Sequence, residues 1–240
     1  MRKRILLLLA LLTVLSACGK KEPAPAVTQA PVAESAIAEE PPPEEEPPVI
    51  VYPGAVEDYL GYIYDYSWYQ EYEPEFVMIH FCSAVVNHRD DPYNIKHVRQ
   101  TFIDADVSIH YIIDREGTVY CCIPENRTAW HAGVGQWKGE EKYKNNMNRY
   151  SIGIELMAIG SYEDMSIYMT EAEYNALDPA LIGYTQAQYE ALEALVADIC
   201  TRHHIPMDRE HVIGHEEFSP NKNDPGDLFD WSRIIQEDET

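Results

Sequence analysis

Two histidines and one aspartate supply a candidate set of metal ligands. His80 closes the apolar run VMIH, and His215 lies nine residues before Asp224 in the polar segment GHEEFSPNKNDPG. Two imidazoles and one carboxylate leave a fourth zinc position for water, as in catalytic zinc sites, and such water has a pKa of about 7. A lone histidine at a strand end is more often structural, and residue types alone do not select these three side chains from nine histidines.

A glutamate and a lysine offer acid–base and charge-stabilising chemistry. In the strand-like segment SIGIEL, the larger apolar side chains alternate to one face, so Glu155 leaves on the face with the small side chains. Apolar surroundings would raise its pKa, which suits a proton shuttle. Lys222 offers a positive charge where negative charge develops on an attacked carbonyl. The alternatives are a solvent-facing strand glutamate and a solvated loop lysine.

Short apolar segments must position these side chains as strands. FVMIHF, beginning at Phe76, is typical of a buried strand, and YSIGIELMAI predicts another. VSIHYIIDREGTVYCCIP predicts two strands joined by a tight Arg-Glu-Gly turn. Such a hairpin makes the sheet mixed rather than purely parallel.

Two helices are expected to cover this sheet. NIKHVRQTFID carries apolar residues at helical spacing, and TQAQYEALEALVADICTRHH carries a longer apolar face. Thr185 and Gln188 form a capping-box pattern at the start of the second helix. Strands alternating with helices predict a single α/β domain, which we place at residues 76–240.

The N-terminal sequence predicts that the protein is located outside the cytoplasm. Residues 1–17 combine a basic start, a short apolar run and the small-residue site LSA, as in a signal peptide. LSAC resembles the lipobox of bacterial lipoproteins, in which the cysteine, here Cys18, becomes the lipidated N-terminus on a bacterial membrane. The alternatives are an ordinary secretory signal with an incidental cysteine and an uncleaved anchor. Residues 18–48 are rich in proline and glutamate and are expected to be a disordered tether.

Residues 49–75 form a tyrosine-rich arm of unusual composition. Its rings either pack on the domain, which we favour, or form an exposed aromatic surface for sugar rings. The formal charge is −23, and removal of the basic signal start makes it more negative. This net negative charge argues against a nucleic-acid partner and against binding to anionic lipids through clustered basic side chains. The cysteines downstream of Cys18 allow disulfides, but their spacing does not determine a pairing.

Five segments occur in an order that resembles a known family. IHFCS, VSIHYIIDREGTVYCC, RTAWHAGVGQWKG, SIGIELM and GHEEFSPNKNDPG look like the zinc-dependent N-acetylmuramoyl-L-alanine amidases of the Amidase_2 group. That group shares its fold with peptidoglycan recognition proteins. The resemblance covers about residues 76–235 and implies a central mixed β-sheet flanked by helices, with one zinc ion in a groove on one face.

The resemblance also implies roles for individual residues. The matched positions are three zinc ligands, a general acid or base, an oxyanion-stabilising lysine and two substrate contacts at the groove wall: His80, His215 and Asp224; Glu155; Lys222; Trp130 and His131. Ile109 stands where another branch of the family has a tyrosine. Cys82 departs from the usual Thr or Ser and is expected near the metal, as a possible stray ligand or oxidation site.

The implied activity is hydrolysis, by zinc-activated water, of the amide between N-acetylmuramic acid and L-alanine in peptidoglycan or its fragments. The enzyme is expected to be a monomer. One alternative is a non-catalytic peptidoglycan-binding module of the same fold, although such modules commonly lack a zinc ligand. Another is a structural lipoprotein whose tyrosine-rich arm binds a partner, which leaves the ordered motifs unexplained.

Overall fold

The structure is a computed structural model that describes residues 49–61 and 65–235. The signal peptide predicted for residues 1–17, the lipidation site Cys18 and the tether predicted for residues 18–48 lie outside these described residues. Within the described part, no helix has the length and apolar character needed to cross a membrane.

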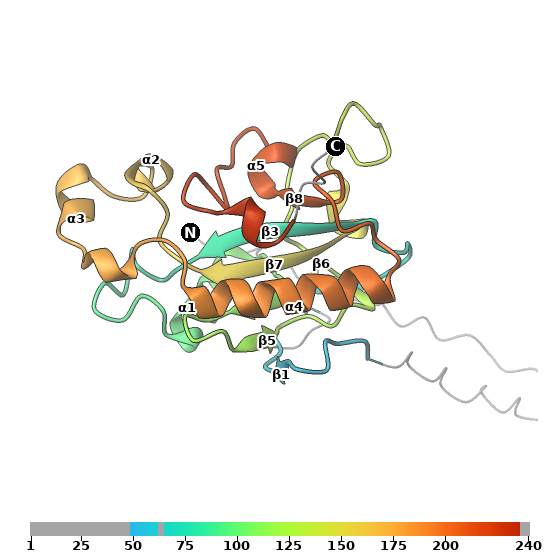
Figure 1. The fold of residues 1–240 in the computed structure, drawn as a ribbon, viewed down its shortest axis with the longest axis horizontal. Coiled ribbons are helices and arrows are strands. Elements are labelled where there is room, and N and C mark those ends of the chain that lie inside the picture. Colours follow the sequence, from blue (N-terminus) through green and yellow to red (C-terminus); the bar gives the residue numbers. More distant parts are fainter. Residues whose placement is uncertain (1–48, 62–64, 236–240) are drawn as a thin grey trace, which may run out of the picture. The chain divides into compact units, whose positions relative to one another are not determined.

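A mixed six-stranded sheet forms the centre of the fold, in the order β1-β5-β4-β7-β3-β8 (Figure 1). Its strands are β1 (Val56–Glu57), β3 (Phe76–Cys82), β4 (Tyr111–Ile113), β5 (Val119–Cys121), β7 (Ser151–Met157) and β8 (Val212–Gly214). β4 and β5 pair antiparallel, and the other neighbouring strands pair parallel. The predicted hairpin and the predicted mixed sheet are therefore confirmed.

Two long helices lie against opposite faces of this sheet. α4 (Gln186–Arg202) packs its apolar face on one side, together with Ile152, Ile154 and Leu156 of β7. α1 (Ile95–Ala105) packs Val98 and Phe102 on the other side, where Ile112 of β4 also points. Both helices were predicted, and the capping box of Thr185 and Gln188 is present at the start of α4.

Several short elements were not apparent from sequence patterns. β2 (Ser67–Tyr69) pairs antiparallel with β6 (Arg127–Ala129) in a separate two-stranded sheet. α2 (Tyr162–Met165) and α3 (Glu171–Asn175) each begin with a capping box. α5 (His215–Phe218) follows β8 directly within a stretch whose polarity indicated a loop. Within the described ranges, short 3₁₀ helices also occur at Met147–Arg149, Pro179–Leu181 and Trp231–Arg233.

The tyrosine-rich segment 49–75 joins the fold through β1 and β2. Tyr52 and Tyr59 are half-buried against the α4-side core, which agrees with rings that pack on the domain. Trp68 and Tyr69 of β2 are 48% and 57% exposed, so part of the aromatic surface faces solvent. Rings packed on the domain and rings that face solvent therefore both occur in this arm.

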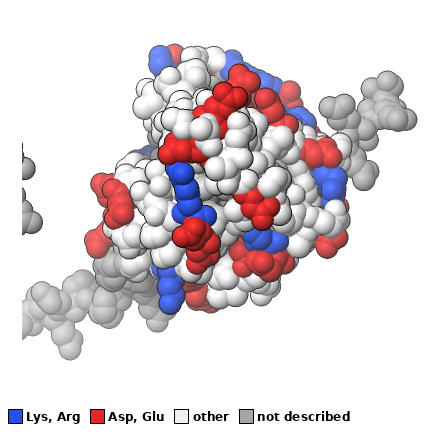
Figure 2. All heavy atoms as spheres, turned by 90° about the vertical axis from the view of Figure 1, so that its left-hand side faces the viewer, with Lys and Arg blue, Asp and Glu red and all other residues white. Residues whose placement is uncertain are grey.

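The four cysteines among the described residues are free. Cys121 lies in the core under α4 and Cys122 in the core under α1, because neighbouring strand residues point to opposite faces. Figure 2 views the side toward which β3 points in Figure 1. On that side, Asp and Glu side chains are interspersed with Lys and Arg.

Candidate active site

The site begins at the carboxyl ends of β3 and β7. His80 and Glu155 are register partners on these parallel strands, so both side chains leave the sheet on the same face. That face is the one opposite α4. The third strand of the site, β8, places His215 immediately after its last residue.

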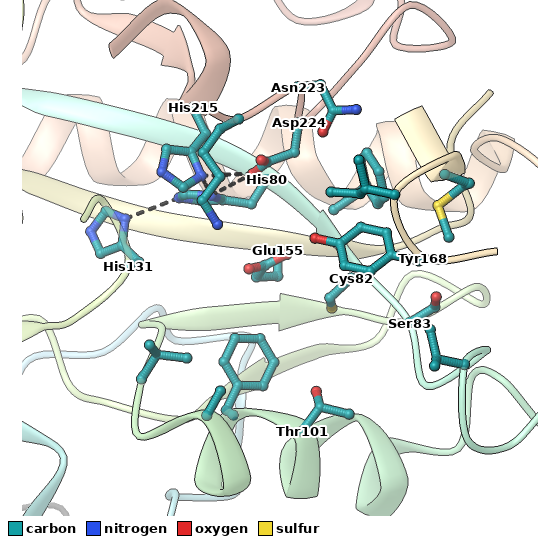
Figure 3. Close-up of a pocket in the computed structure, with 18 of the residues that line it drawn as sticks. His80, Cys82, Ser83, Thr101, His131, Glu155, Tyr168, His215, Asn223 and Asp224 are labelled. Atoms are coloured by element: carbon teal, nitrogen blue, oxygen red, sulfur yellow. Dashed lines mark hydrogen bonds and ion pairs between the residues drawn. The ribbon is translucent and has the colours of Figure 1, made fainter. Parts of the chain in front are cut away.

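Three side chains converge at this edge of the sheet (Figure 3). The Nδ1 atom of His80 lies 2.8 Å from Oδ2 of Asp224 and 3.0 Å from Nδ1 of His215. The His215 Nδ1 atom lies 2.9 Å from the same carboxylate oxygen. Both imidazoles are buried, and the Asp224 side chain is only 13% exposed. The structure thus brings together the three predicted ligands, and they are the one such candidate group among the residues it describes.

The hydrogen-bond partner of Nε2, the ring nitrogen that points away from Asp224, determines the tautomer of His215. Nε2 lies 3.0 Å from the carbonyl oxygen of Ala132, which only accepts hydrogen bonds. Nε2 therefore carries the proton, and a neutral His215 turns the lone pair of Nδ1 toward Asp224.

A chain of hydrogen bonds orients His80 in the same way. Ser151 donates its hydroxyl to the carbonyl of Met147, 2.8 Å away, and so presents a lone pair to Nε2 of His131 at 3.3 Å. With its proton on Nε2, His131 accepts at Nδ1 from Nε2 of His80 at 3.0 Å. The His80 lone pair is then on Nδ1, which faces Asp224.

This donor set fits a cation. Two imidazole lone pairs and a carboxylate pointing at one buried spot repel one another unless a positive charge lies between them. His₂Asp is a ligand set that zinc accepts, and outer-nitrogen hydrogen bonds such as those to Ala132 and His131 are the usual support of metal-binding histidines.

The electrostatics of the three side chains agree with this reading. Burial opposes ionisation of Asp224, but the neighbouring His215 and His80 outweigh it and hold the pKa of this carboxyl below its usual range. Burial lowers the pKa of His80 to about 4, with a smaller contribution from His215. The carboxylate and the neutral imidazole are the protonation states that bind metal.

Glu155 is placed for proton transfer beside this group. It is 8% exposed, and its Oε2 atom is buried without a hydrogen-bond partner. Burial, followed by the negative charge of Asp224, raises the pKa of Glu155 well above its ordinary value. Hydrogen bonding from the Cys82 thiol and the charge of Lys222 act in the opposite direction.

A pocket of about 400 Å³ opens over these residues. Figure 3 shows His80, His215 and Asp224 on one side of it, Glu155 on its floor and Tyr168 near its edge. Its walls come from the ends of β3 and β7, from α1, from the segment around α2 and from the loop before Asp224; the lining includes Phe81, Phe102, Trp130, Tyr168 and Asn223. A concave pocket that combines apolar walls with convergent polar groups is typical of small-molecule sites.

The other predicted site residues also lie at this pocket. Trp130, His131 and Lys222 line it, and Lys222 is exposed. His131 additionally contacts His80, which the sequence did not suggest. Ile109 is fully buried and lies against Gly153.

Two supporting residues were missed by sequence reasoning. The Asn148 side chain accepts hydrogen bonds from the backbone N–H groups of His131 and Ala132 at 2.9 and 2.7 Å. It therefore holds the loop that orients both imidazoles. Tyr168 was missed because it lies in a segment without periodic pattern.

A family model described as N-acetylmuramoyl-L-alanine amidase matches residues 70–227, which is more than half of the chain. The chain belongs to the N-acetylmuramoyl-L-alanine amidase family. The matched range contains every residue placed above at the metal group and its pocket. The α/β fold predicted from the sequence is the fold of this family.

Two curated relatives illustrate the similarity. The N-acetylmuramoyl-L-alanine amidase AmiD of Escherichia coli is 32% identical over 145 residues, covering 57% of this chain and 46% of the relative. The 1,6-anhydro-N-acetylmuramyl-L-alanine amidase AmpD of Citrobacter freundii is 34% identical over 129 residues, covering 53% of this chain and 55% of the relative. The chain spans about half the length of these curated relatives.

Solved amidase structures share the architecture. A selenomethionine AmpD structure matches with a TM-score of 0.53 at 24% identity, over 77% of this chain and 94% of that one. AmiD of E. coli, in complex with the substrate anhydro-N-acetylmuramic acid-L-Ala-D-γ-Glu-L-Lys, matches with a TM-score of 0.50 at 28% identity. That match covers 68% of this chain and 56% of the AmiD chain.

Proposed function

We propose that this protein hydrolyses the amide bond between N-acetylmuramic acid and L-alanine in peptidoglycan or its fragments, with one zinc ion held by His80, His215 and Asp224. The observation that carries the proposal is the convergence of two imidazole lone pairs and a carboxylate beside a buried glutamate, at the floor of a pocket. The substrate bound in the AmiD structure contains this type of bond, and family membership supports the same bond class for this chain.

A zinc ion in this position supplies Lewis acidity, which activates water and polarises a carbonyl. The protein's own residues provide the rest. The hydrogen bonds that His80 donates to His131 and that His215 donates to the carbonyl of Ala132 keep the two imidazoles in the metal-binding tautomer. The pocket walls limit access of bulk water and hold the substrate next to Glu155.

Proton transfer is assigned to Glu155. Its carboxylate accepts a proton from the attacking water and delivers it to the leaving amine of L-alanine. A carboxyl with a raised pKa suits both directions of this transfer near neutral pH. Lys222, at the pocket wall, supplies positive charge where the carbonyl oxygen becomes negative. Trp130 and His131 are proposed to contact the substrate.

Zinc content and peptide release from purified cell wall test this function together. The wild-type protein should bind zinc at one equivalent and release peptides that begin with L-alanine. Asp224→Asn should lose both properties, while Asp227→Asn, an exposed aspartate of the same loop, should keep both. Zinc at one equivalent without peptide release would favour the non-catalytic binding module instead.

We also propose that Cys18 anchors the protein to a bacterial membrane through its lipid chains. Residues 18–48, in a polyproline-like conformation, would reach on the order of 90 Å, which carries the domain away from the membrane surface. Mass spectrometry of the mature N-terminus should find an acylated cysteine, and Cys18→Ser should move the protein from the membrane fraction to the soluble one. An unmodified N-terminus at another residue would overturn this assignment.

A further inference from the structure

An exposed aromatic side chain, Trp68, lies beside Trp130 in the pocket wall. In the β2–β6 sheet, Trp68 of β2 is the register partner of Thr128 of β6, so the two side chains share a face. Trp130 comes two residues after Thr128 and therefore lies on the same face as Trp68. The ring centroids of Trp68 and Trp130 lie 5.5 Å apart. Trp130 lines the pocket, and Ser108, another lining residue, donates its hydroxyl to the carbonyl of Tyr66 at 2.6 Å.

The free part of Trp68 has polar neighbours. The indole is 48% exposed, and the guanidinium carbon of Arg149 lies 5.6 Å from its ring centroid. Arg149 forms an ion pair with Glu71, whose side chain is 58% exposed. A half-exposed ring, with the half-buried Arg149 over it and the exposed Glu71 at its rim, therefore lies beside the pocket.

Sugar rings are suited to such a surface. The C–H groups on one face of a pyranose pack on a flat aromatic ring, and its hydroxyl and acetamido groups hydrogen-bond to polar groups at the rim. Arg149 and Glu71 provide a donor and an acceptor of this kind. The continuity of Trp68 with Trp130 places a ring bound here next to a ring bound in the pocket.

We propose that Trp68, with Trp130, forms a subsite for a neighbouring sugar of the glycan chain, so that polymeric glycan binds better than a single muramyl unit. The inference rests on the proposed function, because the pocket must receive the muramyl end of the substrate. It assigns part of the tyrosine-rich arm to substrate binding.

A membrane surface is the less favoured occupant of the same ring. Glu71, Glu73 and Glu75 follow β2 directly, and Glu73 has a side chain that is 92% exposed. Acidic side chains around the ring are repelled by a surface of anionic lipids.

Tyr69 provides a matched control. It is as exposed as Trp68 and belongs to the same strand, but its side chain leaves the opposite face and lies over Arg127. Trp68→Ala and Tyr69→Ala therefore disturb β2 similarly, and only the first removes the ring beside Trp130. Trp68→Phe keeps an aromatic face and should retain most of the effect.

The test compares two substrates with the full chain. Trp68→Ala should raise KM for a peptide-bearing glycan of four or more sugars roughly three- to tenfold, with kcat unchanged, and leave KM for a single muramyl-peptide unchanged. Tyr69→Ala should change neither. Equal losses on both substrates would show a structural role for Trp68, and no change on the polymer would also overturn the subsite.

Binding without turnover separates this inference from the proposed function. A peptide-free tetrasaccharide of alternating N-acetylglucosamine and N-acetylmuramic acid should bind the wild type more tightly than Trp68→Ala, by the same factor. That result would support the subsite even if no amide were hydrolysed. Equal tetrasaccharide affinity, combined with tighter binding of the wild type to phosphatidylglycerol vesicles, would assign the ring to the membrane instead.

Discussion

The ring of His131 lies where a Cβ atom on Gly153 would be. A Cβ built on Gly153 would meet Nδ1 of His131 at 2.6 Å and Cδ1 of Ile109 at 2.5 Å. Nδ1 of His131 is also the atom that accepts from His80. The glycine in the SIGIEL strand therefore makes room for the residue that orients a metal ligand.

Gly153→Ala should weaken zinc binding while the sheet persists. The added methyl displaces His131, and loss of an outer-nitrogen partner typically lowers metal affinity about 10- to 100-fold. Overpacking should also lower the free energy of unfolding of the metal-free protein by about 1–3 kcal/mol. Competition with a chromophoric zinc chelator and urea denaturation would measure the two effects.

The double variant Gly153→Ala/Ile109→Ala distinguishes the two neighbours. If contact with Ile109 dominates, the double variant should recover zinc affinity; if contact with His131 dominates, it should not. Because His131 is the residue that orients His80, no recovery is expected. Unchanged zinc affinity in Gly153→Ala would show that the position of His131 does not support the metal site.

Glu155→Gln should retain zinc and lose activity. The amide is isosteric with the carboxyl but does not transfer protons, and general acid–base catalysis contributes about 10²- to 10⁴-fold. Peptide release should fall by that factor, while zinc stoichiometry stays at one per chain. Activity equal to the wild type would remove Glu155 from the mechanism.

The same variant has a second readout in the metal-free protein. Because burial raises the folded-state pKa of Glu155, the folded protein holds this proton after the unfolded chain has released its own. The contribution of Glu155 to stability therefore declines as pH rises above about 4.5. Metal-free Glu155→Gln should gain stability relative to the wild type as pH increases from 4 to about 7, and a pH-independent difference would contradict the buried, unpaired state of this carboxyl.

Cys82 is expected to tune Glu155 rather than to react. Burial raises the pKa of the Cys82 thiol well above its usual value, so the thiol remains protonated and donates toward Glu155. Cys82→Ala should raise the pKa of Glu155 further, which shifts the acidic limb of the kcat/KM profile to higher pH. Cys82→Ser should restore the wild-type limb, because a hydroxyl also donates. Identical profiles for all three proteins would show that the thiol has no influence on the base.

The parts of the site predicted from sequence are those carried by long periodic segments. β3 and β7 are seven residues each, so alternation showed that Glu155 and the larger aliphatic side chains lie on opposite faces. The family resemblance selected the metal ligands, which spacing alone did not. The structure then placed those ligands within hydrogen-bonding distance of one another.

Other features depend on contacts that leave no local pattern. β2, β6 and β8 have three residues each, which is too short to show a period, and each exists through pairing with a partner strand. The tautomer of His215 depends on the carbonyl of Ala132, 83 positions away in the chain. Asn148 supports the same loop through its side chain, and an asparagine in a polar stretch carries no signal of that role.

A buried ion-pair cluster away from the pocket should determine the acid stability of the domain. Glu125 is 2% exposed and accepts from Arg202 at 2.5 and 2.8 Å, from His203 at 2.6 Å and from the hydroxyl of Tyr111. Burial alone would raise the pKa of Glu125, but these hydrogen bonds lower it from 4.5 to about 2. A depressed pKa contributes stability that is present above the unfolded-state value and is lost as pH falls toward the folded-state value.

Glu125→Gln should therefore lower the free energy of unfolding by about 2 kcal/mol at pH 7, the scale of charge-assisted hydrogen bonds in a buried site. Wild-type stability should decrease as pH falls from about 4.5 to about 2, and the variant should show a shallower decrease because it has no carboxyl to protonate. Asp198→Asn is the control, since Asp198 is the half-buried second partner of Arg202 and should cost less than about 1 kcal/mol. Urea denaturation at pH 7, 4.5 and 3 gives all three comparisons, and parallel pH profiles for Glu125→Gln and the wild type would show that this cluster does not carry the acid sensitivity.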